Sequence, residues 1–235
     1  MILKRIIPQK VKLKLKLFKL FFCDYMLDFA KPSIHQLQFL FKIETKQEIK
    51  QGIHFDNKLH NFLIAKIKIE EVILFPNQIF SFWKLVGNPS EKNNFKKGRN
   101  IIDGKVSENI GGGLCQISSI VYVTALKAGL EIIERHNHSV DIYKESERFT
   151  PLGSDATVAY GYKDLRIKNT FPFPIRFSFE IKNNSIVCNI ESVERIENKE
   201  LNFKRVSEDN NNVKVLTEIN GVPKYYSIYK KIKEL

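Results

Sequence analysis

Cysteine, glycine and proline are all scarce in this chain of 235 residues. The three cysteines, Cys23, Cys115 and Cys188, are odd in number and widely spaced, which excludes a disulfide-stapled scaffold. With 11 glycines and 8 prolines, the composition also excludes collagen-like chains and flexible linkers. By contrast, 18 phenylalanines and 8 tyrosines supply ample apolar surface to bury, so most of the chain is expected to fold.

Long uninterrupted hydrophobic runs are also missing. A membrane-spanning helix needs about 18–20 apolar residues, and no segment approaches that length. Near the start of the chain, a lysine at every second position from Lys10 to Lys16 interrupts any hydrophobic segment of the signal-peptide type. The expected location is therefore cytoplasmic, with peripheral attachment at the inner membrane face as the alternative.

Acidic residues are absent from the first 20 positions, which hold seven lysines and arginines. The net charge of +12 is concentrated there, because residues 21–235 carry 31 bases against 26 acids. We expect residues 4–19 either to contact an anionic membrane surface or to form a solvated leader ahead of a core-packing helix. Nucleic acid is not an expected partner, since the rest of the chain is nearly balanced in charge and has no motif that reads DNA or RNA.

The sequence pattern divides the chain into three segments. Residues 1–52 are predicted to form a basic helical leader that ends at Gly52. Residues 53–200 are predicted to form an α+β domain, and residues 201–235 a C-terminal strand or tail extension. At the start of the domain, the apolar and β-branched run FLIAKIKIEEVILF predicts short strands.

Three successive glycines, Gly111–Gly113, stand before a segment that is typical of a helix, CQISSIVYVTALKAG, which should end at Gly129. The extended segment LEIIERHNHSVDIY follows, and its alternation places Glu134, His136 and His138 on one face of a strand. Strands are then predicted in DATVAYGY and LRIKNT, and a hairpin turning at residues 183–184 in IRFSFEIKNNSIVCNIESV. This order predicts an α+β fold in which a Cys-bearing helix packs on a mainly antiparallel sheet.

Cys115 falls in the first turn of the predicted helix, where unpaired N–H groups and the helix dipole favour a thiolate. A thiolate there can act as a nucleophile, with His138 or His136 as the base and Asp155 as the group that orients the imidazole. Two alternatives remain, because Cys115 can also be a small packed side chain or a metal ligand. The spacing matches no paired-ligand motif and no nucleotide-binding loop, so neither a metal nor a cofactor is expected.

Five segments in series resemble the VanW family of vancomycin B-type resistance accessory proteins. They are IFSFWKLVG, GGGLCQISS, ALKAGLEIIERHNHS, GSDATVAYGYKDLRIKNT and PFPIRFSF, and the match runs from about Phe75 to Phe179. The resemblance implies a bacterial protein connected to the cell envelope or to glycopeptide resistance. The matching motif positions are Gly111, Gly112, Gly113, Cys115, Gln116, Ser118, Glu134, Arg135, His136, His138, Asp155, Thr157, Asp164 and Arg166.

Two functions follow from these residues together with the resemblance. The first is a thiol-dependent hydrolase or acyl/amide transferase on peptidoglycan peptides or precursors, with an oxyanion site at the Gln116 side chain or the helix-start amides. The second is a non-catalytic module that grips a carboxylate or phosphate of a wall precursor. The substrate-binding groups are then expected to be Gly111–Gly113, Gln116, Ser118, Arg135 and Arg166.

Overall fold

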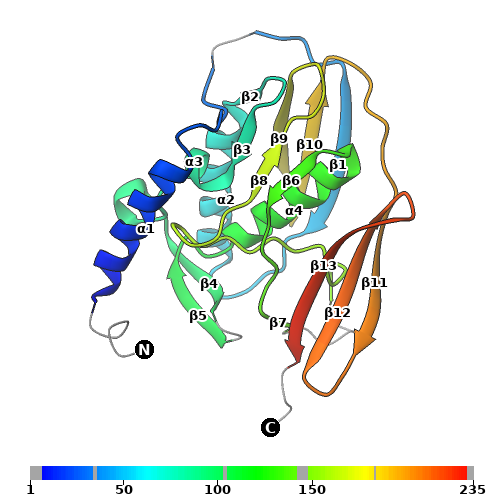
Figure 1. Cartoon of the computed structure of the whole chain (residues 1–235). Helices are drawn as coiled ribbons and strands as arrows, with labels where there is room; N and C mark the ends of the chain where they lie inside the picture. Colours follow the sequence, from blue (N-terminus) through cyan, green and yellow to red (C-terminus); the bar gives the residue numbers. More distant parts are fainter. Residues whose placement is uncertain (1–6, 34–35, 103–104, 142–147, 183, 232–235) are drawn as a thin grey trace.

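The computed structural model describes residues 7–33, 36–102, 105–141, 148–182 and 184–231 (Figure 1). The α-helices in these ranges are α1 (Gln9–Cys23), α2 (Phe55–Glu70), α3 (Phe82–Val86) and α4 (Leu114–Ala128), and a short 3₁₀ helix covers Glu91–Asn93. The strands are β1 (Phe41–Glu48), β2 (Ile73–Leu74), β3 (Ile79–Ser81), β4 (Lys97–Ile102), β5 (Lys105–Ile110), β6 (Glu131–Glu134), β7 (Val140–Asp141), β8 (Arg166–Lys168), β9 (Ile175–Lys182), β10 (Ser185–Ser192), β11 (Leu201–Glu208), β12 (Asn212–Ile219) and β13 (Val222–Lys231). No helix in the described part of the chain is long and apolar enough to cross a membrane.

The main sheet has the strand order β1-β10-β9-β2, and every pairing in it is antiparallel. Helix α4 packs against β1 and β10, and α2 packs against β9, so both helices cover one face of this sheet (Figure 1). The predicted hairpin is confirmed by the β9–β10 register, with Asn184 in the turn at φ 60°. Residue 183 lies outside the described residues. The predicted α+β class, with the Cys-bearing helix on an antiparallel sheet, is confirmed.

Helix α4 is apolar nearly all round because it lies between the main sheet and the rest of the core. Its side chains Ile117, Ile120, Val121 and Leu126 are fully buried. Gly129 adopts a left-handed conformation with φ 77°, and its N–H donates to the carbonyl of Leu126 at 3.0 Å. The predicted helix end at Gly129 is therefore confirmed, and a glycine suits it because other residues are strained at positive φ.

The prediction of a helical leader over residues 1–52 is wrong beyond Cys23. Phe41–Glu48 forms the edge strand β1 instead, paired with β10. Its side chains Ile43, Thr45 and Gln47 point into the core while the intervening charged residues face outward, which is the two-residue period of a strand. Gly52 ends no helix, because it lies between β1 and α2.

The prediction of strands over residues 53–75 is also wrong for most of that range, since Phe55–Glu70 forms α2. Its buried positions Asn61, Phe62, Ala65 and Ile69 recur at helical spacing. The isoleucines suggested a strand, but packing against β9 and α4 overrides their weak intrinsic preference.

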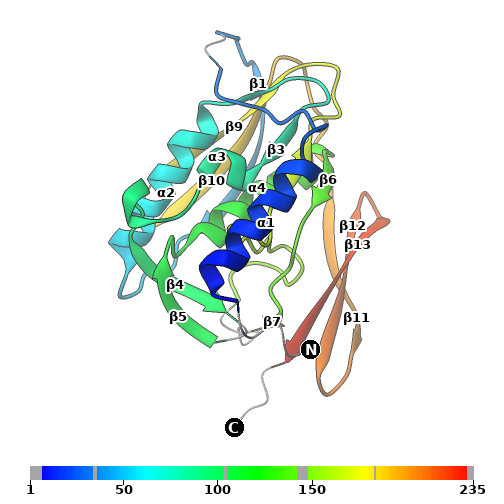
Figure 2. The same ribbon diagram turned by 60° about the vertical axis from the view of Figure 1, so that its left-hand side comes forward.

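Smaller sheets surround the main one. Strands β3, β8 and β6 pair in that order, and β4 pairs with β5 in a hairpin. The C-terminal strands form a sheet with the order β11-β12-β13-β7, which stands beside the main core (Figure 2). Strand β7 joins β13 in parallel, so the segment that follows β6 connects the C-terminal sheet to the domain.

Candidate active site

The Gly111–Gly113 loop is held tightly against β4 and α2, and this fixes the start of α4. A side chain on Gly112 would overlap the backbone of Gly98 in β4, so the two chains touch backbone to backbone. The buried Asn61 side chain donates to the carbonyls of Gly112 (2.9 Å) and Lys96 (3.0 Å), and it accepts from the Lys96 N–H (2.8 Å). The glycines therefore serve a close approach that places Cys115 in the first turn of α4.

Two serines of α4 hold the segment of residues 154–158 against the helix. The Ser118 hydroxyl donates to the carbonyl of Ala156 at 2.6 Å, and the Ala156 N–H donates to the Ser119 hydroxyl at 2.9 Å. The Cys115 Sγ lies 3.7 Å from the carbonyl oxygen of Val158. The predicted strand in this segment is absent from the described residues, because these backbone groups bind side chains of α4 instead of a neighbouring strand.

His138 lies between Asp155 and Cys115. Its Nδ1 is 2.7 Å from Asp155 Oδ2, and its backbone N–H donates to the same oxygen at 2.6 Å. Burial alone would lower the pKa of His138, but hydrogen bonds to Asp155 and Cys115 raise it from 6.5 to about 10. The raised pKa means that the imidazole of His138 carries a positive charge at neutral pH.

The Asp155 carboxylate has further partners from two other parts of the chain. Arg135 Nη2 lies 3.2 Å from Oδ1, and the Tyr229 hydroxyl donates to Oδ1 as well. Burial would raise the pKa of Asp155, but the His138 hydrogen bond and the Arg135 charge lower it from 3.8 to about 2. Burial and the nearby Asp155 raise the pKa of Tyr229, so this hydroxyl remains a donor.

Arg135 supports the Asp155 segment and has several protein partners. Its guanidinium donates to the carbonyls of Asp155 (2.7 Å) and Gly153 (2.8 Å) and to the Ser227 hydroxyl (2.5 Å). The guanidinium also makes a cation–π contact with Tyr122, with 4.9 Å between the guanidinium carbon and the ring centroid. The guanidinium of Arg135 is thus engaged by protein groups, and its expected contact with a substrate carboxylate stays a prediction.

His136 belongs to a different network from His138. Strand β6 ends at Glu134, so the alternation that placed both histidines on one face does not continue. The His136 Nε2 lies 2.9 Å from Glu134 Oε1, and Glu134 also pairs with Arg166 at 3.1 Å. Arg166 in turn binds both carboxylate oxygens of Asp24, at 2.8 and 3.2 Å, so its guanidinium is occupied.

The other expected substrate-binding groups also have protein partners. The N–H groups of Gly111 and Gly112 donate to the carbonyls of Lys96 and Asn109, and the Gln116 side-chain amide donates to the carbonyl of Glu48 at 2.7 Å. For the backbone N–H of Cys115, by contrast, no acceptor is found within the described ranges. The same holds for the backbone N–H of Gly113.

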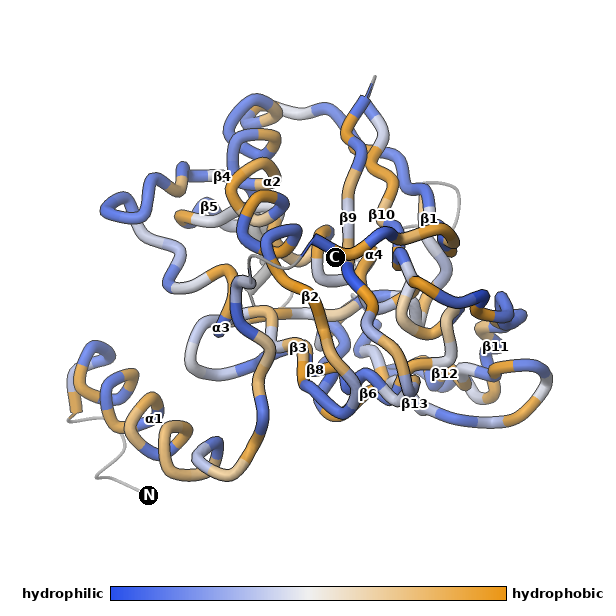
Figure 3. The backbone as a smooth tube through the Cα atoms, turned by 90° about the horizontal axis from the view of Figure 1, so that it is seen from above, coloured by the Kyte–Doolittle hydropathy of each residue, from blue (hydrophilic) through white to orange (hydrophobic). Residues whose placement is uncertain are grey.

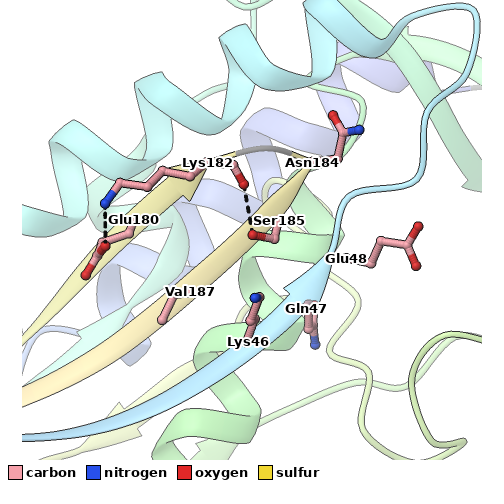
Figure 4. Close-up of a pocket in the computed structure, with 8 residues that line it drawn as sticks. All are labelled: Lys46, Gln47, Glu48, Glu180, Lys182, Asn184, Ser185 and Val187. Carbon is pink, nitrogen blue, oxygen red and sulfur yellow. Dashed lines mark hydrogen bonds and ion pairs between the residues drawn. The ribbon is translucent and has the colours of Figure 1, made fainter.

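No group of three or more His, Cys, Asp or Glu side chains in the described ranges is arranged to hold a metal ion. An open pocket of about 570 Å³ lies on the outer face of the main sheet, away from the helices. Figure 4 shows its lining, which is mostly charged and polar: Lys46, Gln47, Glu48, Glu180, Lys182, Asn184, Ser185 and Val187. Cys115, His138 and Asp155 are not among these residues.

Sequence reasoning missed Tyr229 and Ser227, which reach the site from β13. The burial pattern of β13 places Ser227 and Tyr229 inward and their neighbours outward. That two-residue period identifies an inward face, but it does not show which distant carboxylate this face meets. The contact depends on how the C-terminal sheet docks, and no local pattern encodes that.

A family model described as VanW like protein matches residues 57–191. The chain is 30% identical over 166 residues to Uncharacterized protein YoaR of Bacillus subtilis (strain 168), covering 69% of this chain and 53% of that protein. It is 32% identical over 117 residues to Vancomycin B-type resistance protein VanW of Enterococcus faecalis (strain ATCC 700802 / V583), covering 50% of this chain and 42% of that protein. The chain thus spans about half the length of these curated relatives. No solved structure matches the chain.

Proposed function

The chain belongs to the VanW family, and we propose that it is a cysteine-dependent hydrolase or acyl transferase that acts on peptide amides of the bacterial cell envelope. The observation that carries this proposal is the position of His138, whose Nδ1 lies 2.7 Å from Asp155 Oδ2 and whose pKa is raised by Asp155 and by Cys115. A nucleophile, a base and an orienting carboxylate in contact form the arrangement that activates a thiol for attack on a carbonyl.

The family relationship supports the proposal of a substrate from the cell envelope. One relative is named a vancomycin B-type resistance protein, which connects that protein with resistance to an antibiotic. For this chain we propose peptidoglycan peptides or their precursors as substrates, because they contain the amide bonds that a thiol nucleophile can cleave or exchange. The fold itself carries no weight here, since one fold can host many chemistries.

The reaction proceeds in two steps. The Cys115 thiolate attacks the amide carbonyl carbon, and the oxyanion that forms meets the backbone N–H of Cys115. When the C–N bond breaks, the imidazolium of His138 gives its proton to the leaving amine, and a thioester remains. Water then attacks the thioester and passes its proton to His138, so that the C–S bond breaks and the thiolate and a carboxylic acid are formed. An incoming amine in place of water completes a transfer.

The non-catalytic alternative, a module that grips an anion, has less support. Arg135 and Arg166 are bound to Asp155 and Asp24, and the amides of Gly111 and Gly112 already donate to protein carbonyls. An anion held by these four groups would therefore have to displace existing partners, and buried polar groups that lose a partner are costly.

Selective alkylation tests the proposal without a known substrate. We expect iodoacetamide at about pH 7 to modify Cys115 faster than Cys23, although Cys23 is the more exposed thiol, because the imidazolium of His138 favours the reactive thiolate. His138→Gln should slow modification of Cys115 about tenfold or more, as measured by mass spectrometry of peptides over time.

The matched control is His136→Gln, which should leave the Cys115 rate unchanged because His136 contacts Glu134 instead. The alkylation rate of Cys23 serves as an internal reference in each variant. Equal rates for Cys115 in His138→Gln and in the unmodified chain would contradict the proposed role of His138.

Turnover is tested with peptidoglycan fragments as substrates. We expect the full chain to release or exchange amines on these fragments, and Cys115→Ala to show neither, because no thioester can form. Mass spectrometry of the products distinguishes hydrolysis from transfer. A Cys115→Ala protein that is as active as the unmodified chain would exclude thiol chemistry.

A further inference from the structure

Helix α1 lies along the outside of the domain and is attached to it by one side (Figures 2 and 3). Leu13 packs on Gly161, where an added Cβ would overlap Leu13 Cδ1, and the Lys16 ammonium lies 4.1 Å from the centre of the Tyr162 ring. At the end of the helix, Asp24 binds Arg166 at 2.8 Å. The helix is therefore held in a defined orientation, with one side toward the domain.

The opposite side of α1 exposes an apolar stripe. Val11, Leu15, Phe18 and Phe22 follow one another at intervals of four, three and four residues, which places them on one face of a helix. Their exposed fractions lie between 44% and 64%. We call these four residues the exposed stripe. No residue of α1 is buried, so the rest of the described chain leaves the stripe uncovered.

Two further apolar side chains are exposed just beyond the helix end. Tyr25 is 77% exposed and Met26 is 87% exposed, and both follow directly after α1. Single exposed apolar residues are ordinary, but a helix face of four apolar side chains that includes two aromatic rings is typical of an interaction surface.

Lysines border the exposed stripe, and α1 contains no acidic residue. At 100° per residue, Lys10 and Lys14 lie on one side of the stripe and Lys19 on the other. An apolar face with aromatic residues between two rows of lysines is the pattern of a helix that lies in the plane of a membrane surface. The lysines then reach lipid phosphates while the apolar side chains enter the boundary between headgroups and acyl chains.

We propose that α1 docks the protein on the surface of an anionic lipid bilayer through the exposed stripe. A nucleic acid would satisfy the lysines but would leave Phe18 and Phe22 in water. A second copy of the chain would bring two rows of lysines together in a protein that already carries a net charge of +12. The anionic bilayer complements both the charge and the apolar face.

Vesicle flotation with the full chain tests this proposal. We expect binding to vesicles of phosphatidylcholine mixed with phosphatidylglycerol, weaker binding at high salt, and little binding to phosphatidylcholine alone. The double variant Phe18→Ser/Phe22→Ser should reduce the bound fraction at least about tenfold. A second variant, Lys10→Gln/Lys14→Gln/Lys19→Gln, should reduce binding to the anionic vesicles in particular.

The matched control is Leu63→Ser/Ile67→Ser on α2, a pair with the same four-residue spacing and with exposed fractions of 48% and 57%. This control should bind as the unmodified chain does. Failure of the unmodified chain to bind anionic vesicles, or equal binding by the Phe18→Ser/Phe22→Ser variant, would overturn the proposal. A dimer in sedimentation that this variant abolishes, without vesicle binding, would identify a second copy as the partner and also overturn it.

Discussion

Asp155→Asn is expected to lower the free energy of unfolding by about 3–5 kcal/mol and to slow alkylation of Cys115 at least about tenfold. The Asp155 carboxylate accepts hydrogen bonds from the backbone and the ring of His138, from Arg135 and from Tyr229. An asparagine offers one acceptor oxygen and places an NH₂ group against these donors. The charges of Arg135 and His138 then remain in a largely buried site without their carboxylate.

Urea unfolding followed by circular dichroism measures the stability, and the alkylation rate measures the effect on the thiol. The matched control is Asp56→Asn at an exposed position in the first turn of α2, which should change stability by less than about 1 kcal/mol. An Asp155→Asn midpoint equal to that of the unmodified chain would show that the carboxylate does not organise this site.

The difference in the free energy of unfolding between the unmodified chain and Asp155→Asn should depend on pH in a defined direction. The pKa of Asp155 is lowered from 3.8 to about 2, so its contribution is present above about pH 4 and is lost as pH falls toward 2. The pKa of His138 is raised from 6.5 to about 10, so its contribution is complete below about pH 6.5 and is lost as pH rises toward 10. The stability gap between the unmodified chain and Asp155→Asn should therefore be largest between about pH 4 and 6.5.

The sequence allowed the α+β class and the end of α4 to be predicted because both depend on local signals. Gly129 follows a continuous apolar helix, and the sequences of β9 and β10 alternate on either side of a turn that contains Asn184. The errors at β1 and α2 have a common cause. Phe41–Glu48 is short and charged on one face, and the isoleucines of Phe55–Glu70 prefer strands in isolation. Tertiary packing therefore determined the secondary structure of both segments against their local sequence preference.

The residues of the candidate site could be named from the sequence, but the sequence did not show which of them contact one another. Cys115, His138 and Asp155 come together because Ser118 and Ser119 hold the Asp155 segment on α4. The assignment between His136 and His138 depends on the end of β6 at Glu134, after which the chain no longer alternates. The end of β6 is set by its pairing with β8, whose register shifts between Ile132 and Glu134. The amino-acid composition of this segment does not reveal that shift.

Strands β11–β13 of the C-terminal sheet contribute to the site, although they lie beyond the residues that the family model matches. Tyr229 completes the partners of Asp155, and Ser227 completes those of Arg135. Tyr229 also packs with Val213, Val215 and Phe203, so the docking of this sheet and the orientation of the carboxylate depend on one another. Reactivity of Cys115 should accordingly follow the integrity of the β11–β13 sheet.

Gly112→Ala is expected to lower the free energy of unfolding by about 3 kcal/mol or more. The backbone of Gly112 touches the backbone of Gly98, and the added methyl group would overlap main-chain atoms that cannot rotate away. Either β4 or the loop must move, and movement of the loop weakens the hydrogen bonds that Asn61 makes to Gly112 and Lys96. Because Gly112 is not at positive φ, this cost is one of packing and not of backbone strain.

The matched control for Gly112→Ala is Gly52→Ala, where an added methyl group meets nothing within 4 Å. That change should be neutral or slightly stabilising, because alanine restricts the unfolded chain. Urea unfolding compares the two variants, and the alkylation rate of Cys115 reports whether the start of α4 has moved. If Gly112→Ala unfolded at the same urea concentration as Gly52→Ala, the close approach of the loop and β4 would not be what fixes Cys115, and the position of the thiol would have to depend on the serines of α4 alone.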